Sequence, residues 1–156
     1  MVTTASPDTH RHGYPSRQPV EVVAVLADCE SAARVARAAV QEAVERQVPV
    51  RFLEVLTSHT ADADDQSCSE AEDILFRAGL HALRGHPRTH SVFEVVRGQV
   101  AAVVRQRSLG AALVVVGEDE AYPTEPADRP DQRARRTLAE RGLAAAECPV
   151  RTVPAP

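Results

Sequence analysis

Aliphatic stretches alternate along the chain with stretches in which apolar residues recur at helical spacing. Five stretches have the character of strands, at residues 20–26, 48–56, 91–97, 112–116 and 150–153. The first, Val20 to Leu26, is aliphatic at nearly every position, and the fourth is wholly aliphatic. Strands that are apolar on both sides are typical of a parallel sheet covered on both faces. The pattern therefore predicts such a sheet.

Amphipathic segments separate the predicted strands. Residues 35–44 place apolar side chains at helical spacing, with arginine and glutamate on the other side. Two overlapping capping boxes within 67–72 open a second helix, Gly98 turns the chain into a short third one, and residues 133–146 predict a fourth. Strands that alternate with helices predict a three-layer α/β/α fold, in which a five-stranded parallel sheet carries helices on both faces.

One domain is expected, from residue 19 to residue 156. A hydrophobic content of 44% in 156 residues suffices for a single core. Residues 1–18 are polar and lack periodicity, which predicts a disordered N-terminal tail. The segment from Glu118 to Asp131 is acidic and holds three prolines, so regular structure is excluded there.

Composition narrows the classes of function. A net charge of −4 argues against general nucleic-acid binding, which needs a basic face. No apolar run approaches the roughly 20 residues of a membrane-spanning helix, and no signal peptide is evident, so a cytoplasmic protein without membrane association is expected.

All 18 basic residues are arginine, which excludes any catalytic lysine. Cys29, Cys68 and Cys148 lie far apart, and neither a disulfide nor a metal site is expected.

Four short motifs resemble those of the universal stress protein family. The stretch from Val22 to Asp28 resembles its first strand with a terminal aspartate, and Arg97-Gly98 resembles the glycine that opens its third helix. The stretch from Leu113 to Gly117 resembles its fourth strand, and Cys148-Pro149-Val150 resembles the entry to its last strand. The chain resembles the family from Val20 to about Pro154, and the resemblance implies the three-layer fold. An unrelated flavodoxin-like domain is the alternative.

ATP-binding members of the family continue the fourth strand with G-x-x-G, nine residues and then G-S or G-T. In this chain the motif is broken. Gly117 is present, but the acidic run Glu118-Asp119-Glu120 follows it. At the family's spacing from the last strand, Arg136 and Thr137 occupy the second site, after an insertion. Arginine does not leave the space that a glycine provides for close approach of the backbone to phosphate.

The resemblance also implies which residues would contact a nucleotide if one binds. Asp28 matches the aspartate at the adenine end, and Val55 matches an apolar residue that lines that pocket. Gly117, Arg136 and Thr137 match positions near the phosphates. The alternative role of Asp28 is a cap for the first helix.

Two functional hypotheses follow. The first is a non-catalytic stress or regulatory protein that acts through dimerisation and protein contacts, with ATP binding weak or lost. Its homodimer contact is expected at the last strand, Val150 to Val153, because an uncovered edge strand is a template for association. The second is an ATP- or AMP-binding protein with an altered phosphate loop and slow ATP hydrolysis. No nucleophile elbow or metalloprotease motif favours an independent enzyme.

Overall fold

The computed structural model describes residues 20–26, 29–56, 65–118 and 147–154. The predicted tail at 1–18, the acidic segment beyond residue 118 and the predicted last helix at 133–146 lie outside these residues. The described elements are β1 (Val22–Val25), α1 (Cys29–Arg46), β2 (Val50–Leu56), α2 (Asp65–Leu83), β3 (Ser91–Arg97), α3 (Val100–Ser108), β4 (Leu113–Gly117) and β5 (Val150–Val153).

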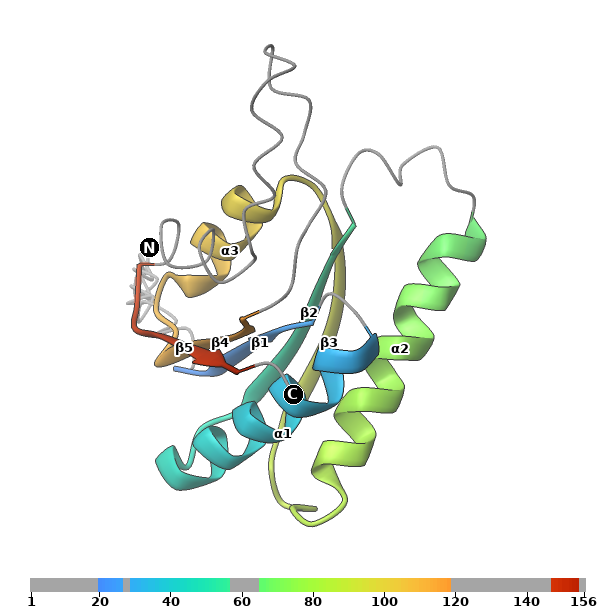
Figure 1. Ribbon diagram of the computed structural model, residues 1–156. Helices are drawn as coiled ribbons and strands as arrows, with labels where there is room; N and C mark the ends of the chain where they lie inside the picture. Colours follow the sequence, from blue (N-terminus) through green and yellow to red (C-terminus); the bar gives the residue numbers. More distant parts are fainter. Residues whose placement is uncertain (1–19, 27–28, 57–64, 119–146, 155–156) are drawn as a thin grey trace, which may run out of the picture.

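The strands form one parallel sheet in the order β3-β2-β1-β4-β5 (Figure 1). β1 lies in the middle, where Val22 is in register with Val50 of β2 and with Leu113 of β4. The chain moves outward from β1 to β3 and then crosses back to β4, so the strand order reverses between β1 and β4. The predicted five-stranded parallel sheet is confirmed.

Helices cover both faces of the sheet (Figure 1). Successive side chains of a strand point to opposite faces. Val22 and Ala24 therefore pack in the core beneath α1 and α2, whereas Val23 and Val25 pack in the core beneath α3. All four are at most 1% exposed. This double burial explains why the strand is aliphatic throughout, and it confirms the predicted three layers.

Several elements begin or end one or two residues from the predicted positions. The second strand begins at Val50 rather than at residue 48. The reason is that the Val48 amide still donates to the Ala43 carbonyl at 3.0 Å, and Gln47 adopts a positive φ of 56° that ends α1. α2 begins at Asp65, two residues before the first predicted cap.

Four charged side chains form an ionic network on the α3 side of the sheet. Arg51 of β2 donates from Nε to Glu21 Oε1 and from Nη1 to Glu94 Oε2, both at 2.7 Å. Arg107 of α3 donates from Nε to the same Glu94 oxygen at 3.0 Å, and its Nη2 contacts the other oxygen. The four side chains are 15% to 29% exposed. The network joins β2, β3 and α3 and pairs each charge with an opposite one.

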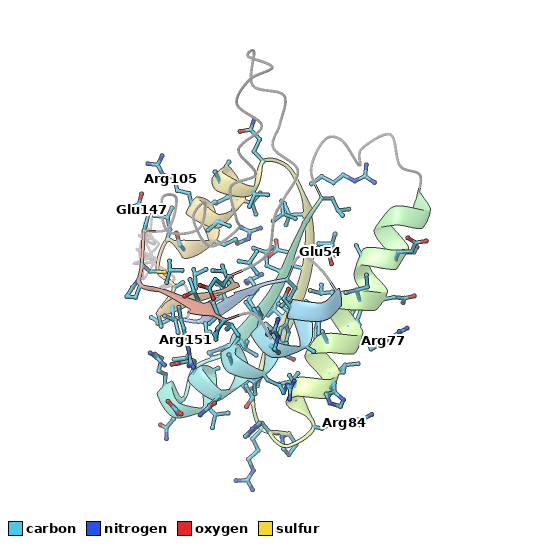
Figure 2. The ribbon with its side chains drawn as sticks, viewed as in Figure 1. Glu54, Arg77, Arg84, Arg105, Glu147 and Arg151 are labelled. Atoms are coloured by element: carbon cyan, nitrogen blue, oxygen red, sulfur yellow. The ribbon has the colours of Figure 1, made fainter. Side chains whose placement is uncertain are left out.

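Ser108 joins the end of α3 to the segment that enters β5. It is fully buried. Its Oγ donates to the Arg105 carbonyl at 2.9 Å and accepts from the Glu147 amide at 2.8 Å. The side chains of Arg105 and Glu147 also meet, with 3.3 Å between Nε and Oε1 (Figure 2).

Candidate functional site

The candidate site lies at the carboxyl ends of the strands. In open parallel sheets, ligands bind in the crevice outside these ends at the point where the strand order reverses. Here that point lies between β1 and β4, beside Leu26 and Gly117. α3 begins at the same edge of the sheet, because it follows the carboxyl end of β3 after two residues.

Gly98 turns the chain from β3 toward α3. Its φ is 157°, and its amide donates to the Leu56 carbonyl at 2.9 Å. A Cβ at this position would lie 3.3 Å from Cγ2 of Val103. Gln99 then precedes the helix with an extended backbone, and its side chain makes no capping hydrogen bond. The predicted turn at Gly98 is confirmed.

Gly117 ends β4, where it is buried in register with Val153 of β5. The next amide, that of Glu118, donates to the Val153 carbonyl at 2.9 Å. The Glu118 side chain is exposed. The residue after the glycine therefore uses its amide within the sheet, and it places a carboxylate beside the predicted phosphate position.

Of the five predicted nucleotide contacts, the structure describes Val55 and Gly117. Val55 is 3% exposed and packs in the core beneath α3, one residue before the end of β2. Both residues lie at the carboxyl edge, on either side of β1. Asp28, Arg136 and Thr137 lie outside the described residues, and their roles stay predictions.

A polar hollow of about 630 Å³ opens at the opposite, amino-terminal edge. Its lining includes Glu21, Arg51 and Arg107, together with the turn at 109–111. Sequence analysis missed it, because these residues come from separate segments and each resembles an ordinary surface charge. The available signal was Arg51 within a largely apolar strand, since a charge in such a place requires a partner.

Cys148 is a free, half-buried thiol. Burial raises the pKa of this thiol, so its neutral form is favoured over the nucleophilic thiolate. Among the residues that the structure describes, no group of three or more His, Cys, Asp and Glu side chains is placed to hold a metal ion. In the same part of the chain, every helix is too short or too polar to cross a membrane.

No protein-family model and no curated protein sequence matches this chain. Solved structures of universal stress proteins, however, are similar to it. The universal stress protein UspA from Lactobacillus plantarum matches with a TM-score of 0.63 at 17% identity, over 86% of this chain and 97% of that one. A universal stress protein from Archaeoglobus fulgidus matches with a TM-score of 0.60 at 19% identity, over 85% and 97% of the two chains.

A further structure, of the universal stress protein from Archaeoglobus fulgidus in complex with dAMP, has a TM-score of 0.53 at 17% identity. It covers 85% of this chain and 96% of the other. Identities this low carry information about the fold, and the coverage is nearly complete for the solved proteins. The predicted resemblance is confirmed at that level: this chain has the three-layer α/β fold of the universal stress proteins.

Proposed function

We propose that this chain is a regulatory or stress-response protein of the universal stress type, which acts through homodimerisation and protein contacts. It is not an enzyme, and its ATP binding is weak or lost. The fold that it shares with UspA from Lactobacillus plantarum supports the class. The observation that carries the loss of ATP binding is Glu118, which directly follows Gly117 and donates its amide to Val153.

A triphosphate at this edge would meet charge of its own sign. Two like charges about 4 Å apart repel by on the order of 4 kcal/mol at an effective dielectric of about 20, before screening by salt. Glu118 contributes one such charge, and Asp119 and Glu120 add two more in the sequence. The Glu118 amide would also have to leave Val153 before it could contact phosphate. Both effects weaken ATP binding.

A second candidate is an ATP- or AMP-binding protein with an altered phosphate loop and slow ATP hydrolysis. Its support is the Archaeoglobus fulgidus neighbour, whose structure is a complex with dAMP. In this candidate, Arg133, Arg135 and Arg136 would contact the phosphates, because guanidinium groups bind phosphate without close approach of the backbone. Asp28 and Val55 would contact the adenine end.

Calorimetric titration with Mg-ATP separates the two candidates. We expect no binding tighter than about millimolar, an affinity worth roughly 4 kcal/mol, and no phosphate release above that of buffer. A micromolar dissociation constant would contradict the proposal and favour the second candidate. In that event, joint replacement of Arg133, Arg135 and Arg136 by alanine should abolish binding.

A matched variant isolates the effect of charge at the candidate site. Glu118→Gln removes the carboxylate and keeps the amide that donates to Val153. If repulsion contributes, this variant should bind Mg-ATP several times more tightly than the wild type and bind AMP with little change. Equal ATP affinity in both proteins would show that the charge of Glu118 is not the cause.

The proposed homodimer uses the outer edge of β5. Among the described strands, β5 pairs with β4 alone. The carbonyls of Pro149 and Val153 accept hydrogen bonds from the β4 side. Because backbone groups along a strand point alternately to its two sides, those of Val150 and Thr152 point outward. Such a row of donors and acceptors is a template for pairing with a second copy.

A further inference from the structure

A ridge of four exposed side chains runs along α2 and ends in the turn that follows it. Its members are Glu72, Phe76, Leu80 and Arg84, each four residues after the last. Side chains four residues apart are neighbours on a helix surface. The two apolar members keep 45% and 56% of their surfaces exposed. The neighbouring face of α2 packs against the sheet and α1, so the ridge borders the core and stays exposed to solvent.

The ridge is self-complementary. From the amino end it presents an acid, two apolar side chains and a base. A two-fold axis between Phe76 and Leu80 reverses this order in a second copy. Glu72 then faces Arg84 of the other copy, and Phe76 faces Leu80, twice in each dimer. A two-fold interface requires this kind of match between a surface and itself.

Both charges of the ridge are available for a partner. Among the described residues, neither Glu72 nor Arg84 takes part in the ion pairs that join the helices and strands. Figure 2 shows Arg77 of α2, and Arg84 in the turn after this helix, extending away from the sheet. A second copy would give each charge an opposite one.

The apolar centre of the ridge is held in place before any partner arrives. The Phe76 ring stacks on Phe93 of the edge strand β3, with centroids 4.7 Å apart and planes inclined by 22°. Phe93 packs in turn on Phe52, at 5.0 Å between centroids. A side chain that is already ordered loses less entropy when it enters an interface.

We propose that two copies of this chain pair through this ridge, with their α2 helices antiparallel. The contact differs from the β5 homodimer, which uses the other flank of the sheet, beyond β4. Copies that use both contacts would build tetramers or larger assemblies, because each two-fold contact leaves the other surface open.

Charge reversal tests the pairing by sedimentation velocity over a range of concentrations. Glu72→Arg and Arg84→Glu each replace two attractive pairs by two repulsive ones, and each should raise the dissociation constant of this contact about tenfold. The double variant restores opposite charges at both places, and it should recover wild-type association. Such recovery cannot result from damage to the fold.

Two further variants complete the test. Arg37→Glu reverses an exposed charge on α1 and should leave association unchanged. Leu80→Ser removes apolar contact at the centre of the ridge and should weaken association, with an unchanged circular dichroism spectrum. The proposal is overturned if the wild type and both single variants sediment alike, or if the double variant associates more weakly than either single one.

Discussion

At the scale of single residues, Glu94 shows how a charge is accommodated against an apolar sheet. Burial by itself would raise the pKa of Glu94, but hydrogen bonds from Arg107 and Arg51 outweigh it, and the pKa lies below its ordinary value of 4.5. The reciprocal effect holds for Arg51, whose pKa is raised by its hydrogen bond to Glu21 despite desolvation. The network therefore favours the charged form of both partners.

The lowered pKa of Glu94 makes stability depend on pH. Its contribution is present above the unfolded value of 4.5 and is lost as the pH falls through the lower folded pKa. Glu94→Gln should reduce the free energy of unfolding at pH 7 by about 1–2 kcal/mol and flatten its decline below pH 4.5. Urea unfolding at neutral and acidic pH measures both effects.

The control for this prediction is Glu147→Gln. Glu147 pairs with Arg105 at the surface, where the two side chains are 49% and 70% exposed. Loss of an exposed pair should cost less than about 1 kcal/mol. Equal losses in the two variants would show that the network adds nothing beyond an ordinary surface pair.

At the scale of elements, α2 sits close to the sheet because Gly79 has no side chain. A Cβ there would lie 2.4 Å from Phe93 Cε1 and 3.0 Å from Phe52 Cδ2. Alanine is the better helix former by about 1 kcal/mol, yet it would have to displace the stacked Phe93 ring. Gly79→Ala should therefore lower the free energy of unfolding by about 1–3 kcal/mol.

Gly85 provides the matched control for Gly79. It lies two residues beyond the end of α2, and a Cβ there would meet nothing within 4 Å. Gly85→Ala should be neutral, or stabilise by up to about 1 kcal/mol through the unfolded chain. Thermal unfolding of both variants gives the comparison. If Gly79→Ala stabilised the protein, the Phe93 and Phe52 rings would have to move aside at little cost in free energy.

The Ser108 hydroxyl contacts the segment that enters β5, through a hydrogen bond from the Glu147 amide. Ser108→Ala removes the acceptor of the Glu147 amide in a fully buried position. We expect a loss of about 1–2 kcal/mol in the free energy of unfolding and faster amide exchange in β5. Gln106→Ala, at an exposed position of α3, should change neither quantity. Unaltered exchange in the Ser108 variant would show that β4 alone positions the strand.

Sequence analysis predicted the elements well because burial on both faces imposes a simple pattern. The central strand is aliphatic for that reason. The turn at Gly98 could be predicted for a different reason, because its positive φ favours glycine. The polar features escaped prediction for a physical reason. Arg51 and Glu94 are 43 residues apart, and their meeting depends on the register of two strands.

The candidate site could be predicted only in part, again for a physical reason. The sequence located Val55 and Gly117 near the carboxyl edge, because parallel strands end there together. The hydrogen bond from Glu118 to Val153 depends on how β5 pairs with β4, which local pattern does not determine. Asp28, Arg136 and Thr137 fall outside the described residues, so their part of the prediction is untested.

At the scale of the whole molecule, the two edges of the sheet differ in ways that bear on assembly. β3 spans seven residues and lies beside the α2 ridge, whereas β5 spans four and follows the segment that Ser108 holds. Arg151 of β5 also contacts Glu42 of α1. The β5 edge is thus anchored from both faces of the sheet, which favours a strand that keeps its shape when a second copy pairs with it.

Proline at Thr152 tests the β5 homodimer. The Thr152 amide points outward, so Thr152→Pro should remove a donor to the second copy and spare the hydrogen bonds to β4. By light scattering at tens of micromolar, we expect the variant to have half the mass of the wild type.

Proline at Arg151, whose backbone groups face β4, should instead loosen the strand and lower the thermal midpoint. A wild-type protein that is a clean monomer of 16.8 kDa would rule out this dimer, and so would an unchanged mass in the Thr152 variant.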